Sequence, residues 1–142
     1  MRRVIRVLAA VLWLVPAAGL LAGDAQAEKD AEASARKWLA GVDAGKYGAS
    51  WEAASSLFRK SMTKTQWEDA LAKVRAPLAA VLSRTFKSAT YTKTLPGAPE
   101  GEYVVIQYDT EFSGHAGGRM TETVTPAKES DGTWKVSGYY IK

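Results

Sequence analysis

The spacing of apolar residues changes from a helical period to a strand period near Arg84, and this change constrains the fold of the 142-residue chain more than any other feature. Residues 28–42 place apolar side chains along one helical face: Ala35, Trp38, Leu39 and Val42. Residues 102–112, "EYVVIQYDTEF", alternate along one face of a strand: Val104, Ile106, Tyr108, Thr110 and Phe112. Helices followed by strands predict an α+β fold, with N-terminal helices packed on a bent antiparallel sheet of about four strands.

Three helices are expected before the sheet. The first covers residues 28–42 and is followed by Gly45, a residue suited to cap its end. Ser50 is expected to cap a short second helix. A third helix is expected to begin with a capping box of Thr65 and Glu68 and to bury a stripe of Trp67, Leu71 and Val74. Pro77 should interrupt it, with one more helical turn at 78–82.

Turn sequences separate the expected strands. "PGAPEG", "SGHAGG" and "SDG" predict the three connections of the sheet. The last strand, "TWKVSGYYIK", carries apolar residues on both faces, which predicts a strand buried on two sides, either central in the sheet or covered by helices. Gly138 within it predicts a bend or bulge.

The first 27 residues have the three parts of a secretory signal peptide. These parts are Arg2, Arg3 and Arg6, an apolar run from residue 7 to 21, and the small-residue site Ala25-Gln26-Ala27. The run is shorter than the roughly 20 residues of a membrane span. We therefore expect cleavage after Ala27, a single domain at 28–142, a periplasmic or secreted location and no stable membrane insertion.

Composition excludes several kinds of chemistry. The absence of cysteine excludes disulfides, a thiol nucleophile and a thiolate metal site. The net charge of +4 falls to +2 when residues 1–27 are removed, and the remaining basic residues are scattered, so no nucleic-acid surface is expected. His115, the single histidine, lies in a glycine-rich loop without a positioned partner. We expect it to be an exposed loop residue, and we expect no metal and no cofactor.

Glu122 is the most informative polar residue. It lies between Met120 and Val124 on the expected inner face of a strand, where a carboxylate must be paired or hydrogen-bonded. Arg75 and Arg84, on either side of the Pro77 break, are its candidate partners. Two interpretations stay open: a buried ion pair that fixes helices on the sheet, or the polar floor of a binding pocket lined by Trp51, Trp67, Tyr108 and Tyr140.

Several stretches resemble a family of small exported bacterial proteins, domain of unknown function 4019. These are "PLAAVLSR", "LPGAPEGEYVVIQYDTEF" and "ETVTPAKESDGTWKVSGYYIK", preceded by Trp51, Trp67 and Arg75. The resemblance covers nearly all of residues 28–142 and implies no assigned activity. The order of elements also resembles the cone-shaped fold of nuclear transport factor 2-like and cystatin-like proteins, an analogy that does not fix function.

These observations favour a non-catalytic module of the cell envelope that binds a small amphipathic ligand or an envelope protein. A second hypothesis is a small pocket enzyme, a hydrolase or isomerase with Glu122 as acid or base. A third is a self-associating structural module, for instance a homodimer formed through an apolar outer face of the sheet.

Overall fold

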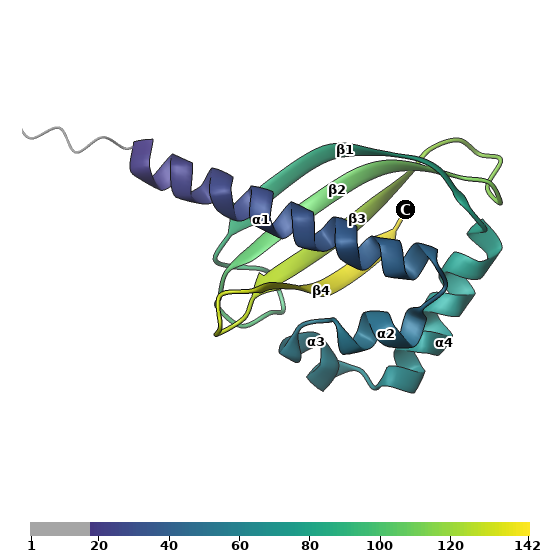
Figure 1. Ribbon diagram of the computed structural model, residues 1–142, viewed down its shortest axis with the longest axis horizontal. Coiled ribbons are helices and arrows are strands. Elements are labelled where there is room, and N and C mark those ends of the chain that lie inside the picture. The colour runs from purple at the N-terminus through teal and green to yellow at the C-terminus, as the bar shows by residue number, and fades with distance from the viewer. Residues whose placement is uncertain (1–17) are drawn as a thin grey trace, which may run out of the picture.

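The computed structural model describes residues 18–142, so most of the predicted signal peptide lies outside the described residues. One long helix and three short ones precede the sheet: α1 (Ala18–Asp43), α2 (Tyr47–Glu52), α3 (Ser56–Ser61) and α4 (Lys64–Arg75). A short 3₁₀ turn, η1 (Ala76–Leu78), leads into four strands: β1 (Val81–Thr92), β2 (Tyr103–Phe112), β3 (Met120–Lys128) and β4 (Trp134–Ile141). The strands form one antiparallel sheet in the order β1-β2-β3-β4 (Figure 1), which confirms the predicted α+β class.

The core lies between α1 and the inner face of the sheet. In Figure 1, α1 runs across that face, while α2, α3 and α4 gather near one end of the molecule. The predicted helical stripe is buried on α1, and all five alternating residues of β2 are buried as predicted: Val104, Ile106, Tyr108, Thr110 and Phe112. Removal of this apolar surface from water, at about 25 cal/mol per Å², supplies the main driving force for packing α1 on the sheet.

The caps of the short helices differ from the prediction. Ser50 lies inside α2, where its hydroxyl donates to the carbonyl of Tyr47, and Ser55 caps α3 by accepting from Phe58 N at 3.1 Å. The capping box of α4 is formed by Thr63 and Gln66, two residues before the predicted pair. Both positions fit the same cap pattern, so the sequence alone did not determine the register.

The buried face of α4 also differs. Trp67 and Leu71 are buried as predicted, but Val74 is 48% exposed and Arg75 is buried in its place. The next turn of the helix therefore directs a guanidinium toward the sheet.

The segment after Pro77 does not form the predicted helical turn. Ala79 has φ 58° and ψ −131°, a conformation that L residues with a Cβ rarely adopt, and β1 begins at Val81. Ala80 donates to Ser113 Oγ at 3.0 Å and accepts from Ser113 N at 2.8 Å. These hydrogen bonds to the end of β2 hold the segment extended.

The final strand is an edge strand with an exposed outer face, which corrects the prediction of a strand buried on two sides, whether central or covered by helices. Tyr140 on its outer face is 51% exposed. The predicted bend is present as a β-bulge, because Thr125 lies opposite Gly138 whereas Pro126 lies opposite Val136, which leaves Ser137 as the extra residue.

The turn between η1 and β1 yields a prediction about backbone strain. Ala79→Gly should raise the free energy of unfolding by up to about 1 kcal/mol, because glycine adopts a positive φ without the steric cost of a Cβ. Gly114→Ala should lower it, since an added Cβ would lie 2.2 Å from the carbonyl oxygen of Pro77. Urea unfolding of both variants tests this, and a destabilised Ala79→Gly protein would contradict it.

Candidate functional site

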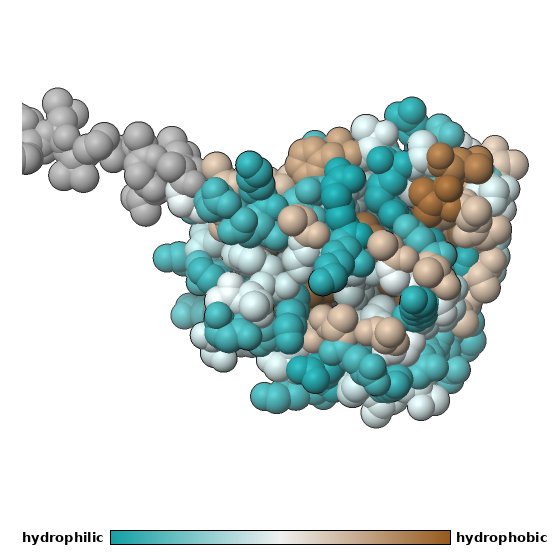
Figure 2. All heavy atoms as spheres, in the orientation of Figure 1, coloured by the Kyte–Doolittle hydropathy of each residue, from teal (hydrophilic) through white to brown (hydrophobic). Residues whose placement is uncertain are grey.

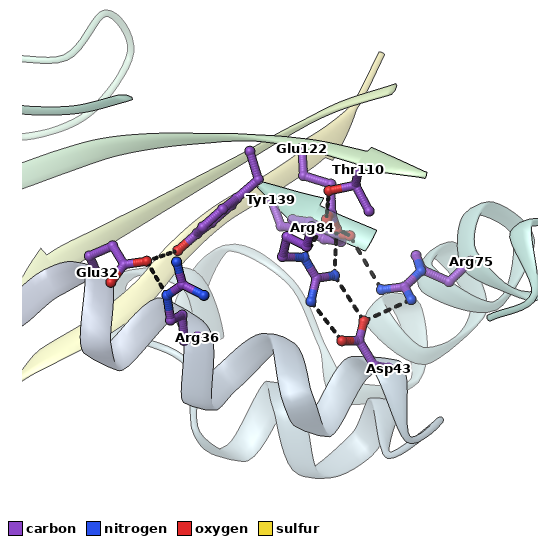
Figure 3. A network of polar contacts seen from close by, with 9 residues as sticks. Glu32, Arg36, Asp43, Arg75, Arg84, Thr110, Glu122 and Tyr139 are labelled. Carbon is purple, nitrogen blue, oxygen red and sulfur yellow. Dashed lines mark hydrogen bonds and ion pairs between the residues drawn. The ribbon is translucent and has the colours of Figure 1, made fainter. Parts of the chain in front are cut away.

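Glu122 is completely buried on β3 and receives four hydrogen bonds (Figure 3). Arg84 donates to both carboxylate oxygens, with Nε 2.7 Å from Oε1 and Nη2 3.2 Å from Oε2. Thr110 Oγ1 lies 2.6 Å from Oε1, and the hydroxyl of Tyr139 donates to Oε2. Of the two arginines that the sequence left open, Arg84 is therefore the one that pairs with Glu122.

Asp43, the last residue of α1, joins the two arginines. Arg84 contacts it through Nη1 at 2.7 Å from Oδ2 and Nη2 at 3.0 Å from Oδ1. Arg75 Nη2 lies 2.9 Å from Asp43 Oδ1, and its Nη1 lies 3.4 Å from the hydroxyl of Tyr139. Arg75 thus reaches Glu122 only through Tyr139.

We call these six residues the buried polar cluster, after its buried members Arg75, Thr110 and Glu122; Arg84 and Tyr139 are partly buried, and Asp43 lies at its exposed end. Each comes from a different element, in the order α1, α4, β1, β2, β3 and β4. Two guanidinium and two carboxylate groups balance one another, so the cluster brings no net charge into the interior. It joins the long helix, the last short helix and every strand at one point.

Burial and pairing together set the pKa values in the cluster. Partial burial would raise the pKa of Asp43, but the hydrogen bonds and charges of Arg84 and Arg75 outweigh it and lower that pKa. Burial, followed by the Glu122 carboxylate, raises the pKa of Tyr139. The pKa of Arg84 is raised, because its two carboxylates outweigh the effect of burial, so the guanidinium keeps its charge.

This geometry leaves little opportunity for catalysis at Glu122. A general acid or base must come within hydrogen-bond reach of a substrate proton. Both carboxylate oxygens of Glu122 are already bonded to the protein, and the side chain is 0% exposed. The cluster has the features of an interaction that fixes packing. Among the described residues the Nε of Arg75 has no hydrogen-bond partner, and its guanidinium lies 5.1 Å from the centre of the Phe112 ring.

Three of the four aromatic residues predicted to line a pocket around Glu122 make their contacts elsewhere. Trp67 packs in the helical core, 4.9 Å from Phe58 between ring centres, and its Nε1 lies 2.9 Å from Ser50 Oγ. The indole of Trp51 donates to the carbonyl of Met62 at 2.8 Å. Tyr140 lies opposite Thr123 on β3 and is half exposed, so neither it nor the two tryptophans surround Glu122.

Tyr108 is nearer to the cluster, since it pairs with Glu122 across β2 and β3. Its hydroxyl, however, donates to Glu32 of α1 at 2.9 Å, and Arg36 lies 5.5 Å from its ring centre. Burial, followed by Glu32, raises the pKa of Tyr108. Tyr108 therefore forms a second polar contact between α1 and the sheet.

Sequence reasoning missed Asp43, Thr110 and Tyr139. Asp43 has the appearance of an ordinary solvated residue at a helix end. Thr110 lies on the predicted buried face, two residues before Phe112, and this position of a hydroxyl group was the available signal for a buried polar contact. Tyr139 and Tyr140 are equivalent in the sequence, and only the strand register identifies which one faces Glu122.

Two grooves lie on either side of α1. The β1 groove, of about 580 Å³, is lined by Glu28, Lys29, Glu32, Arg36, Phe86, Ser88 and Ala89. The β4 groove, of about 480 Å³, is lined by residues of α1, α2 and β4: Ser34, Lys37, Trp38, Gly41, Lys46, Ala49, Ser50, Ala53, Trp134, Lys135 and Val136. Neither groove includes a residue of the buried polar cluster.

Within residues 23–142, no three histidine or acidic side chains gather in a way that would hold a metal ion. His115 is partly exposed in the loop between β2 and β3. None of the described helices is both long and apolar enough to cross a membrane.

The chain belongs to the family described as "Protein of unknown function (DUF4019)", whose sequence profile matches residues 34–139. No curated protein matches the chain. Among solved structures, one from Catenulispora acidiphila is similar over 88% of this chain and 92% of its own, with a TM-score of 0.50 and 11% sequence identity. At this identity the similarity concerns the fold alone.

The ion pair of Glu122 yields a prediction about stability. Arg84→Leu should lower the free energy of unfolding by about 3–5 kcal/mol, because it leaves the buried Glu122 without its cation. Glu122→Leu should lower it by less, because Arg84 keeps its ion pair with Asp43. The double variant should lose less than the sum of the two. Arg119→Leu, which breaks the exposed pair with Glu111, is the control and should change stability by no more than about 0.5 kcal/mol. Unchanged melting temperatures for both cluster variants would contradict the assigned role.

The lowered pKa of Asp43 yields a prediction about acid stability. Because this pKa is lower in the folded state, its carboxylate contributes stability above the unfolded value of about 3.9, and the contribution disappears as pH falls through the folded value. Asp43→Asn should therefore be less stable than the wild type at neutral pH, and the difference should shrink below about pH 4.

Urea unfolding across this pH range measures the difference. Asp69→Asn, which removes an exposed carboxylate of α4, is the matched control. A difference between Asp43→Asn and the wild type that stays constant down to about pH 2 would show that Asp43 does not depend on its charge.

Proposed function

We propose that this chain is an exported, non-catalytic module that binds a small amphipathic ligand in the cell envelope. One observation carries the proposal: the only fully buried carboxylate among the described residues, Glu122, is engaged on both oxygens by the protein itself, while the grooves beside α1 are open. The interior supports the fold, and the surface beside α1 is available to a ligand.

The volumes of the grooves support this proposal. Both lie within the range of about 300–1,000 Å³ that is common for small-molecule sites. Each combines apolar side chains with charged ones at the rim. Phe86 in the β1 groove is 45% exposed, and Trp38 and Trp134 lie in the β4 groove.

The two other hypotheses have less support. A pocket enzyme with Glu122 as acid or base requires access to a carboxylate that is 0% exposed. Self-association through the outer sheet face requires an apolar surface there, but this face carries Gln107, Thr121, Thr123 and Thr125 on its two central strands. Tyr140 is a large exposed apolar side chain on that face. Phe86 of β1 pairs with the inner-facing Tyr108, Leu82 lies in the irregular start of β1, and Val74 lies on α4.

The predicted export remains part of the proposal. Helix α1 extends through the predicted cleavage site, since it begins at Ala18. Among residues 23–30 none is buried, and from position 23 onward the first buried residue is Ala31. Cleavage after Ala27 would therefore shorten the helix without removing a buried contact among these residues, which supports the proposed processing.

Native mass spectrometry of the protein purified from the envelope of a bacterial host after expression of the full chain tests both parts. We expect the mass of residues 28–142 and an additional small-molecule adduct that dissociates on collisional activation. The spectrum of a denatured sample serves as the control, because it should lack the adduct. The uncleaved mass would contradict export, and a bare protein mass that also binds no added amphiphile would contradict ligand binding.

A further inference from the structure

The β4 groove is built from two helical stripes that face each other. On α1, Ser34, Lys37, Trp38 and Gly41 recur at the spacing of one helical face, and on the second side Lys46, Ala49, Ser50 and Ala53 do the same. The first residues of β4, Trp134, Lys135 and Val136, complete the lining. On the face seen in Figure 2, the surface is hollowed between α1 and α2, with pale and brown atoms lying between teal side chains.

The charged residues that line the groove are all basic, while Asp131, outside the lining, interacts electrostatically with Lys135. The lining contains three lysines, Lys37, Lys46 and Lys135, and no acidic residue. In the part of the chain from residue 23 onward, none of the three forms an ion pair. The β1 groove differs, since Glu28 and Glu32 accompany its cations. An anionic group at the rim of the β4 groove would relieve the repulsion among these lysines.

The floor of the groove suits an apolar body rather than a second charged group. Trp134 is partly exposed and presents indole surface, and the largely buried Trp38 and Val136 lie behind it in the lining. The opposite wall consists of small side chains, Ala49 and Ala53, which leave space beside the rings. A Cβ added at Gly41 would meet no atom within 4 Å, so this part of the wall is open.

The edge of β4 beside the groove is already occupied. The carbonyl of Trp134 accepts from Ser34 Oγ at 2.6 Å, and the carbonyl of Val136 accepts from Ser55 N at 2.8 Å. A peptide that adds to a sheet edge needs these backbone groups. The chain's own hydrogen bonds therefore disfavour an extended peptide and favour a ligand that has no backbone to pair.

From these four features we infer that the β4 groove binds a free long-chain carboxylate, with its chain against Trp134, Ala49 and Ala53 and its head group between Lys37 and Lys46. The inference rests on the proposed function and names the chemical class of its ligand. The β1 groove, whose lining contains both acidic and basic residues, takes no part in this binding.

Isothermal titration calorimetry with three twelve-carbon probes tests the class of ligand. Dodecanoate, below its micellar concentration, should bind the protein expressed from the full chain, and dodecylamine and dodecanol should bind at least about tenfold more weakly, since they lack the anion that the lysines bind. Tryptophan fluorescence should change on the same titration, because two indoles line the groove.

Two kinds of variant locate the site. Lys37→Glu combined with Lys46→Glu should weaken dodecanoate binding by about tenfold or more. Lys60→Glu combined with Lys73→Glu, which changes net charge equally at exposed positions of α3 and α4, should leave the affinity unchanged. Ala49→Phe should weaken binding by filling the groove without altering charge.

The outcomes separate this inference from the proposed function. Equal affinity for the three probes, or no loss in the groove double variant, would overturn the carboxylate assignment and leave ligand binding intact. Absence of binding by all three probes would overturn both. Binding to phosphatidylglycerol vesicles without binding of dodecanoate would show that the lysines meet a lipid surface, and it would overturn the assignment of a free ligand.

Discussion

The arrangement of this domain depends on Arg84, which donates to two carboxylates from opposite layers. Its guanidinium bonds Glu122 of the sheet at 2.7 Å and Asp43 at the end of α1 at 2.7 Å. A planar guanidinium suits this role, because its donors have a fixed geometry that a lysine lacks. The end of the long helix is thus fixed near one end of the four strands, and Arg75 and Tyr139 add the last helix and the last strand to the same point.

A neutral group of ionic side chains in a core is not in itself a large source of stability, since desolvation offsets much of the attraction. The cluster instead specifies the position of α1 on the sheet, because apolar packing of α1 against β2 alone would tolerate small shifts along the helix axis. The hydrogen bonds to Glu122 tolerate no such shift without leaving a buried carboxylate unpaired. We therefore interpret the cluster as the interaction that fixes one arrangement of helices and sheet among several of similar apolar burial.

Much of the fold could be predicted from the sequence, because periodicity is local. The buried faces of α1 and β2 followed from spacing, and so did the buried position of Glu122. The buried polar cluster could not be predicted in full, since its members are brought together by register: Asp43 and Arg84 are far apart in the chain, and Tyr139 rather than Tyr140 faces inward because of the pairing of β3 with β4. The edge position of β4 likewise depends on strand order, and the analogy to the nuclear transport factor 2-like cone stays a prediction.

The same cluster explains why a binding function belongs at the flanks of α1. In a helix-on-sheet fold, the space between the layers can serve either as a core or as a ligand cavity, but the same volume cannot serve as both. Here Glu122 and Tyr108 are buried in that space and bonded to other elements, so it is closed. The flanks of α1 remain open to a ligand, and at the β4 side the partly exposed indole of Trp134 lies among lysines in a lining without an acidic residue.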